Sequence, residues 1–175
     1  ILDAGCGDGY LSRKLARLGA KVTGVEISER MLAYAREEEE NEPLGISYHL
    51  ASCASLPFLP ASAFDVVLTN NVIQDLADYQ GAFREFGRLL RPGGTYLHIA
   101  NHPCFMTPVW GWVRDEEGRR MHRKVDYYFQ RGPFLCPWGA KSGMEPTVYW
   151  HRTLGDIMNE LISCGFDICR VIEPE

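Results

Sequence analysis

The sequence lacks two features that would place it among membrane or nucleic-acid-binding proteins. It has no uninterrupted apolar run near the ~18 residues that a bilayer-spanning helix needs. It also has no basic surplus, since 18 Lys and Arg stand against 23 Asp and Glu, for a net charge of −5. Proteins that grip nucleic-acid phosphates usually carry such a surplus. We therefore expect neither a membrane nor a nucleic acid as partner.

Its six cysteines form neither a Cys-x-x-Cys pair nor a dense framework. Scattered cysteines are typical of a reducing compartment, and we predict a cytoplasmic location. A metal site is not expected either. His98 and His102 are four residues apart, but the segment between them is predicted to pass from strand to loop. No second pair has the spacing that would complete a tetrahedral site.

An initiator Met is absent as well, and the chain opens on the apolar strand-like residues Ile1-Leu2. We therefore expect a portion of a longer protein. A length of 175 residues fits one domain, and a hydrophobic content of 46% is enough for a proper core. We predict a single domain over residues 1–175.

Strand-like and helix-like patterns alternate over the first hundred residues. Helices are predicted from apolar residues at helical spacing, over 11–18, from 29 onward after the N-cap Ser28, and over 79–90. The acids Glu37–Glu40 near the end of the second helix are expected to face solvent. Strands are predicted over 1–4, 21–27, 46–50, 64–69 and 95–100. This alternation predicts an α/β fold with a doubly wound, mostly parallel sheet.

The pattern breaks over residues 102–151, which hold 10 of the chain's 20 aromatic residues and show no sustained period. We interpret this stretch as an irregular, aromatic-rich insertion after the fifth strand that forms a substrate-side lid. Its aromatic side chains are expected to line a pocket or form a small core: Trp110, Trp112, Tyr127, Tyr128, Trp138 and Trp150. A helix after the N-cap Thr153 and a last strand over 166–172 follow.

A glycine-rich turn follows the first strand, with glycines at positions 5, 7 and 9. Such a turn lets a ligand lie against the main chain. The dinucleotide fingerprint G-x-G-x-x-G does not fit, because Tyr10 occupies the place of its third glycine. Glu26 ends the second predicted strand, where a carboxylate can accept both hydroxyls of a ribose.

Five blocks of the sequence carry a family resemblance. They occur in family order over residues 1 to 101: Ile1–Gly9, Glu26, Leu56-Pro57-Phe58, Phe64–Val67 and Leu90–Gly94. With them the chain resembles the class I S-adenosylmethionine-dependent methyltransferases, which have a Rossmann-like fold. The resemblance implies S-adenosylmethionine as cofactor and an enzyme that transfers its methyl group.

The resemblance also implies residue roles. Asp3, Gly5, Cys6 and Gly7 would border the methionine part of the cofactor, and Glu26 would bind the ribose hydroxyls. Further cofactor contacts are implied for five residues: Ile27 beside the adenine, Ser52 at its amino group, Cys53 and Ala54 through their backbone, and Asn70 through its carbonyl.

Methyl transfer requires an aligned acceptor, exclusion of water and, for a hydroxyl acceptor, removal of a proton. Neutral histidine suits the last task near pH 7. We predict His102, at the start of the insertion, as the first catalytic candidate and His151, at its end, as the second. A structural histidine bonded to the backbone remains the alternative for each.

The acceptor is predicted to be a small molecule, attacked through O, N or C. The Asn/Asp-Pro-Pro-Tyr/Phe run of many nucleic-acid and protein methylating relatives is replaced here by Asn70-Asn71-Val72-Ile73. The insertion carries seven Lys and Arg against five Asp and Glu, which favours a polar or anionic acceptor. Two alternatives stay open: a non-catalytic module that binds S-adenosylmethionine and, less favoured because of Tyr10, a nucleotide-dependent oxidoreductase. The oligomeric state is not predicted.

Overall fold

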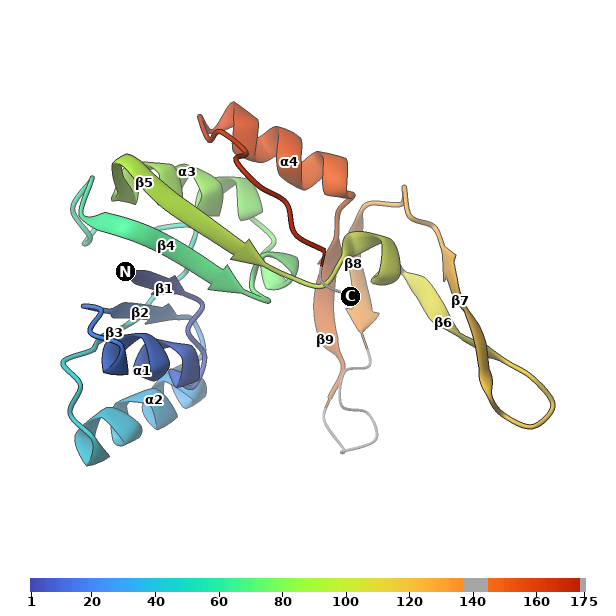
Figure 1. Cartoon of the computed structure of the whole chain (residues 1–175), viewed down its shortest axis with the longest axis horizontal. Helices are drawn as coiled ribbons and strands as arrows, with labels where there is room; N and C mark the ends of the chain where they lie inside the picture. Colours follow the sequence, from blue (N-terminus) through green and yellow to red (C-terminus); the bar gives the residue numbers. More distant parts are fainter. Residues whose placement is uncertain (137–144, 174–175) are drawn as a thin grey trace. The chain divides into compact units, whose positions relative to one another are not determined.

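The computed structural model describes residues 1–136 and 145–173 (Figure 1). Trp138, one of the aromatic residues expected to line a pocket, lies outside the described residues. The chain divides into two compact units, where the sequence predicts a single domain. The first unit comprises residues 1–73 and 78–100, and the second comprises 74–77 and 101–175.

A five-stranded sheet forms the centre of the first unit. Its strands are β1 (Leu2–Ala4), β2 (Thr23–Glu26), β3 (Ser47–Leu50), β4 (Phe64–Asn70) and β5 (Leu90–Ile99). They lie in the order β3-β2-β1-β4-β5, and every neighbouring pair is parallel. The predicted doubly wound parallel sheet is confirmed, although β2 is shorter than expected and β5 begins five residues earlier than the predicted position 95.

Helices cover both faces of this sheet. They are α1 (Tyr10–Arg17), α2 (Glu29–Asn41) and α3 (Tyr79–Leu89), and the short helix η1 (Ile73–Asp75) precedes α3. The chain builds β1, β2 and β3 in one direction and then returns to place β4 and β5 on the other side of β1. Because parallel crossovers are right-handed, this reversal puts α1 and α2 on one face and α3 on the other, as Figure 1 shows.

Two apolar layers hold the helices to the sheet. Leu32 and Ala35 of α2 pack with Val22, Ile46 and Tyr48. On the opposite face, α3 buries Phe83, Phe86 and Leu89 completely. The strand order reverses between β1 and β4, and ligands of open α/β sheets bind at the carboxyl ends of the strands beside such a point. The fold therefore directs attention to the turns that follow β1, β2, β3 and β4.

The second unit contains two antiparallel strand pairs, so the prediction of an irregular 102–151 stretch was wrong. Strand β6 (Val109–Arg114) pairs with β7 (Arg120–Asp126), and β8 (Gly132–Cys136) pairs with β9 (Thr147–His151). The short helix η2 (Pro103–Phe105) precedes them. These strands have only five to seven residues, and Gly111 in β6 and Pro133 in β8 interrupt the apolar pattern, so no long alternation marks them in the sequence.

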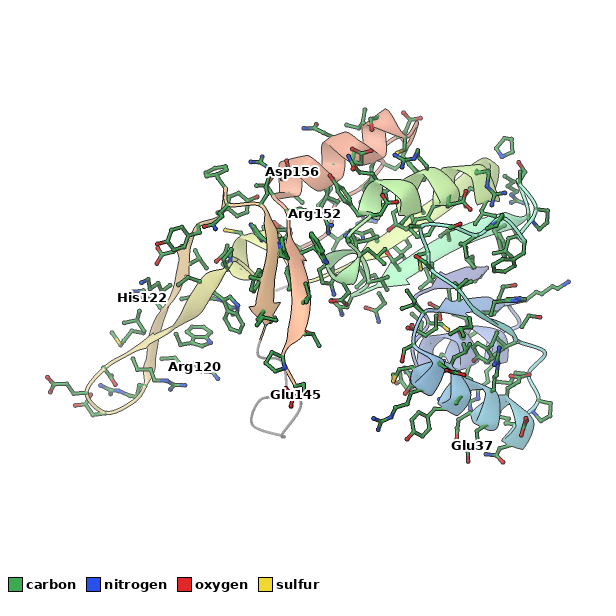
Figure 2. The ribbon with its side chains drawn as sticks, turned by 180° about the vertical axis from the view of Figure 1, so that it is seen from behind. Glu37, Arg120, His122, Glu145, Arg152 and Asp156 are labelled. Atoms are coloured by element: carbon green, nitrogen blue, oxygen red, sulfur yellow. The ribbon has the colours of Figure 1, made fainter. Side chains whose placement is uncertain are left out.

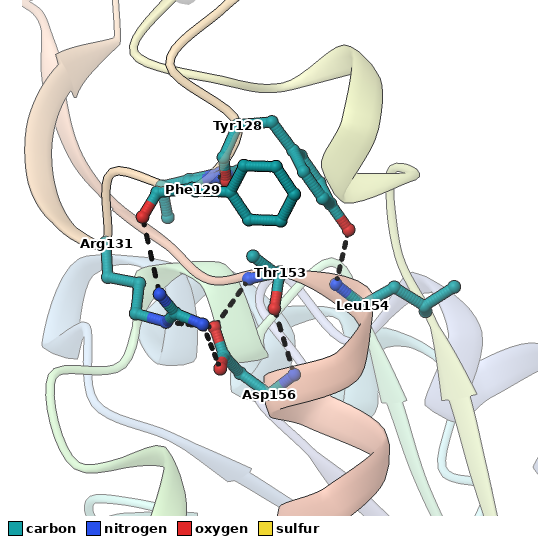
Figure 3. A network of polar contacts seen from close by, with 7 residues as sticks. Tyr128, Phe129, Arg131, Thr153, Leu154 and Asp156 are labelled. Atoms are coloured by element: carbon teal, nitrogen blue, oxygen red, sulfur yellow. Dashed lines mark hydrogen bonds and ion pairs between the residues drawn. The ribbon is translucent and has the colours of Figure 1, made fainter.

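Helix α4 (Leu154–Ser163) also belongs to the second unit. The predicted N-cap Thr153 is confirmed, because its hydroxyl accepts from the backbone of Asp156 while the Asp156 carboxylate accepts from the backbone of Thr153. Arg131 pairs with the same carboxylate at 2.7 Å and lowers the pKa of Asp156 to about 2. The Tyr128 hydroxyl accepts from the Leu154 backbone at 2.9 Å (Figure 3). These contacts tie the start of α4 to the segment between β7 and β8.

The last strand predicted over 166–172 does not form. This segment has no regular structure, and Ile168, Val171 and Ile172 are exposed. An alternating apolar pattern makes a strand only where a neighbouring strand accepts its backbone hydrogen bonds. The segment pairs with none of the described strands.

Candidate functional site

The turn after β1 adopts the backbone that its glycines allow. Gly5, Gly7 and Gly9 all have positive φ, at 78°, 57° and 76°. The backbone N–H groups of Gly5 and Cys6 both donate to the Val25 carbonyl of β2, at 2.8 and 3.0 Å. This anchors the turn against the end of the neighbouring strand.

The glycines differ in the space beside them. A Cβ on Gly5 would overlap the Val72 side chain, coming within 2.7 Å of Cγ1. A Cβ on Gly7 would meet only the end of the Met31 side chain, at 3.6 Å. Gly5 therefore allows close internal packing, whereas the main chain at Gly7 is open for contact with a ligand.

Glu26 ends β2, and its carboxylate reaches back to the glycine turn. Oε2 accepts from the Gly7 N–H at 2.9 Å. Oε1 accepts from the backbone of Ile27 at 3.0 Å and of Ser28 at 2.8 Å. Two carboxylate oxygens offer about four lone-pair directions, so the group keeps capacity to accept further donors such as ribose hydroxyls.

Asp3 is enclosed beneath this turn, with 2% of its surface exposed. The Ser12 hydroxyl of α1 donates to its Oδ2 at 2.5 Å. Burial raises the pKa of Asp3 to about 6; hydrogen bonds from Ser12 oppose this shift and the nearby charge of Glu26 adds to it. The first unit thus holds two neighbouring carboxyl groups at the ends of β1 and β2.

The loop after β3 joins the same region. The Ala51 N–H donates to the Glu26 carbonyl at 3.0 Å, and the Ser52 hydroxyl accepts from the Ala54 backbone at 3.3 Å. Cys53 is buried beside the backbone N–H of Gly5, and burial raises the pKa of its thiol to about 12. This thiol is therefore a packing group that stays protonated at neutral pH.

Two further predicted cofactor residues lie at neighbouring strand ends. Ile27 follows β2 with 67% of its side chain exposed, which leaves an apolar surface beside the Glu26 carboxylate. Asn70 is the exposed last residue of β4, and its amide oxygen accepts from the side chain of Asn71 at 3.3 Å. All ten predicted cofactor residues thus lie in the first unit, on the ends of β1, β2 and β4 or in the turns that follow β1, β2 and β3.

The predicted catalytic histidines belong to the second unit. His102 is half-buried, and its Nδ1 accepts from the Cys104 backbone at 3.1 Å. Its Nε2 lies 2.7 Å from a carboxylate oxygen of Glu173. Because Nδ1 accepts the hydrogen bond from the Cys104 N–H, the neutral ring carries its proton on Nε2 and donates it to Glu173. Sequence reasoning missed Glu173, which lies in no motif.

His151 occupies a structural position. The side chain is completely buried, with Nδ1 3.0 Å from the Met106 carbonyl and Nε2 2.8 Å from the Tyr128 carbonyl. Both nitrogens therefore face backbone oxygens, and neither is open to take a proton from a substrate. This geometry supports the structural alternative for His151 over the expected catalytic role.

An open hollow of about 470 Å³ lies in the second unit beside His102. Its lining residues come from the segment after β5, from η2 and from both strands of the β6–β7 hairpin: Asn101, His102, Phe105, Met106, Trp112 and Arg123. The sequence marked Trp112 and His102 in advance. Arg123 was missed, because one arginine on a basic strand carries no distinguishing signal.

Metal sites, membrane-spanning helices and disulfides can each be considered over the described ranges 1–136 and 145–173. No group of three or more His, Cys, Asp or Glu side chains is placed to hold a metal ion. Within these residues no helix is both long and apolar enough to cross a membrane. All six cysteines lie in them, and no disulfide joins any two.

Comparison with known proteins gives the family. Residues 2–98 match the family described as "Methyltransferase domain". A solved S-adenosylmethionine-dependent methyltransferase from Mesorhizobium loti is 36% identical, with a TM-score of 0.81 over 97% of this chain and 74% of its own. A candidate enzyme of the same description from Listeria monocytogenes is 30% identical, with a TM-score of 0.83 over 99% of this chain and 79% of its own. The chain therefore belongs to the S-adenosylmethionine-dependent methyltransferases, with their Rossmann-like fold.

A curated relative from Nitrosococcus oceani, a "Ubiquinone biosynthesis O-methyltransferase", is 38% identical over 83% of this chain. The chain spans 63% of that relative and between 36% and 38% of three others with the same name. The residues found here thus correspond to part of the length of these curated enzymes.

The strand-end residues of the first unit fit the cofactor of this family. Glu26 offers a carboxylate for a ribose diol, Ile27 an exposed apolar surface for an adenine, and Gly7 an open stretch of main chain. Asp3 adds a carboxyl group to a region that would receive a cationic ligand. Tyr10, 57% exposed at the start of α1, stands where a dinucleotide fingerprint needs glycine. This arrangement favours S-adenosylmethionine over a nicotinamide dinucleotide.

Proposed function

We propose that this protein methylates an oxygen atom of a small molecule, with S-adenosylmethionine as methyl donor. One observation carries the proposal: the Glu26 carboxylate at the end of β2 is held by the Gly7 N–H of the turn after β1. The contact holds a carboxylate with the chemistry to accept ribose hydroxyls beside open main chain, at the carboxyl ends of two parallel strands, and this supports the proposal. The O-methyltransferase names of the curated relatives support oxygen over nitrogen or carbon as the attacked atom.

In this proposal the first unit binds and orients the cofactor. When bound, S-adenosylmethionine supplies a methyl group on a positively charged sulfur, which a positioned hydroxyl can attack directly. Glu26 fixes the ribose, and the backbone of the glycine turn fixes the methionine part. Holding the hydroxyl and the methyl group in line removes the entropy cost of bringing them together, and positioning of this kind accounts for much of the rate of such reactions.

We propose the His102–Glu173 pair as the proton acceptor for the hydroxyl. The Nε2–H of His102 holds the Glu173 carboxylate at 2.7 Å, and the Cys104 N–H fixes the ring through Nδ1. The Glu173 carboxylate would take the hydroxyl proton as the new C–O bond replaces the C–S bond of the methyl group, with neutral S-adenosylhomocysteine as the leaving group. His102 is then a positioning residue rather than the base that the sequence predicts.

The first experiment is calorimetric titration with S-adenosylhomocysteine, the product form of the cofactor. Glu26→Ala should weaken its binding by about 1.5–3 kcal/mol, the range for losing hydrogen bonds to a charged group. Glu37→Ala is the matched control, since Glu37, which Figure 2 labels, is an exposed acid of α2, eleven residues after Glu26 in the sequence. Equal affinity of wild type and Glu26→Ala would refute the assigned role.

A second experiment separates an enzyme from a non-catalytic binding module. The full chain is incubated with S-adenosylmethionine carrying a labelled methyl group and a panel of hydroxylated small molecules. Transfer of label to any of them supports the proposal. Tight cofactor binding with no transfer to any member would favour the binding module. The expected cytoplasmic location stays a prediction.

A further inference from the structure

The hollow in the second unit has an unusual combination of walls. Phe105, Met106 and Trp112 supply apolar and aromatic surface, whereas Arg123 supplies a positive charge. A volume of about 470 Å³ falls within the usual range of small-molecule sites. The hollow is therefore of a size to take a molecule of one or two rings.

Arg123 is held in place by stacking. It lies opposite Trp112 in the β6–β7 pair. Its guanidinium carbon lies 5.0 Å from the ring centre of Trp110, 5.6 Å from that of Phe105 and 5.8 Å from that of Trp112. Nη2 donates to the Phe105 carbonyl at 2.8 Å. The aromatic rings and this hydrogen bond orient the guanidinium group before any ligand arrives.

The charge of Arg123 has no counter-ion in the part of the chain that the structure describes. Its Nε is buried and has no hydrogen-bond partner among these residues. Two acidic side chains of the hairpin form ion pairs with other basic residues: Asp126 pairs with Lys124 at 2.9 Å, and Asp115 pairs with Arg119 at 2.6 Å. The guanidinium group is thus left with a charge that no carboxylate of these residues balances, and an anion bound in the hollow would balance it.

Neighbouring side chains of the hairpin strengthen the positive character of this surface. Arg120 lies over the Trp112 ring at 4.9 Å. Figure 2 labels Arg120, which lies on β7 with Arg123. An anion approaching the hollow therefore meets an attractive field before it contacts Arg123.

We infer that the hollow binds an aromatic carboxylate that bears a hydroxyl group, with Arg123 pairing with the carboxylate. A planar guanidinium can donate two parallel hydrogen bonds to a carboxylate, which makes it a specific partner for such a group. The ring of the ligand would lie against Phe105 and Trp112. This inference rests on the proposed function in one respect, because it takes the bound molecule to be the methyl acceptor.

The test compares a charged probe with its neutral ester. Binding of 4-hydroxybenzoate and of methyl 4-hydroxybenzoate to the full chain is measured by calorimetry in saturating S-adenosylhomocysteine. We expect the acid to bind at least about tenfold more tightly than the ester, since only the acid offers a carboxylate. Cyclohexanecarboxylate, which keeps the charge and loses the aromatic ring, should bind at least about threefold more weakly than the aromatic acid.

Variants of the hairpin assign the preference to one residue. Arg123→Gln should abolish the preference for the acid, and Arg123→Lys should keep part of it, because lysine keeps the charge without the fork. Arg119→Gln is the matched control, with the same change of charge on the same hairpin at an exposed side chain outside the hollow. Thermal unfolding of each variant checks that it is folded. If Arg123→Gln does not fold, Arg123→Lys still tests the role of the guanidinium group.

Three results would overturn the inference. They are equal binding of acid and ester by the wild type, a preference of wild-type size in every folded Arg123 variant, and no binding of either probe. Equal binding of the cyclic aliphatic acid would overturn its aromatic part. Titration with S-adenosylhomocysteine alone keeps the two proposals separate. Failure of that titration counts against the proposed function, whereas its success with no acid preference counts against the hollow alone.

Discussion

Replacing Asp3 by Asn tests the electrostatics of the cofactor region directly. Asp3 is 2% exposed, and burial raises the pKa of its carboxyl group to about 6 from a model-peptide value of 3.8. Asparagine has nearly the same shape and can still accept the hydrogen bond from the Ser12 hydroxyl. The substitution therefore removes the charge with little change in packing.

The size of the expected stability difference follows from the raised pKa of Asp3. A folded-state pKa above the unfolded value means that the protonated form is favoured in the folded protein. Its contribution is complete below about pH 3.8 and is lost as pH rises through about 6. A difference of about two pKa units at 1.36 kcal/mol each corresponds to ~3 kcal/mol. Near pH 7.5 the unliganded Asp3→Asn variant should thus be more stable than wild type by up to about that amount.

Urea denaturation at a series of pH values measures the effect. We expect the gap in unfolding free energy between variant and wild type to widen from pH 4 to pH 7 and then to level off. Ser12→Ala is a control, because it removes the hydroxyl donor of this pair and keeps the titrating group. A gap that does not change with pH, or a variant that is less stable throughout, would show that burial does not govern the Asp3 carboxyl group.

Four further substitutions test other parts of the structure. Gly5→Ala should destabilise the protein by more than ~1 kcal/mol, because position 5 has a φ of 78° and a Cβ would overlap Val72. Urea denaturation measures this effect, and an unchanged urea midpoint would contradict it. Glu39→Ala should cost about 1–3 kcal/mol in the same assay, because Oε1 of Glu39 accepts from three backbone N–H groups of the turn before β3, and an effect below the error would refute this. Glu173→Gln should lower kcat of methyl transfer more than about tenfold with little change in cofactor affinity. His102→Gln, which can still offer an N–H to the carboxylate, should lower kcat less, and the reverse order would return the base role to His102.

The sequence determined the architecture of the first unit. The apolar periods of β1 to β5 and of α1 to α3 are local properties, readable within a window of ten to fifteen residues. The glycine turn and Glu26 are also local signals, because positive φ at positions 5 and 7 and a carboxylate at a strand end need no distant partner to be recognised. The contact between Gly7 and Glu26 follows from the parallel pairing of β1 with β2.

Other features depended on pairing between distant segments. The run Glu37–Glu40 was expected to face solvent, yet Glu39 turns inward and accepts from the turn before β3. The 166–172 segment has an apolar pattern suited to a strand but no neighbouring strand to pair with. A pattern indicates what a segment can form, and its neighbours decide whether it does so.

The two histidines show most clearly which features the sequence predicts and which depend on the tertiary structure. The sequence places His102 and His151 at the two ends of an aromatic stretch and gives no means of telling them apart. The tertiary structure encloses His151 between two backbone carbonyls and leaves His102 at an open hollow, facing Glu173. The sequence by itself therefore determined the sheet, the glycine turn and the carboxylate at the end of β2, because backbone constraints and apolar period act over short distances. Only the tertiary structure decided which polar groups are buried and what they face, because burial and hydrogen-bond partners come from segments far apart along the chain.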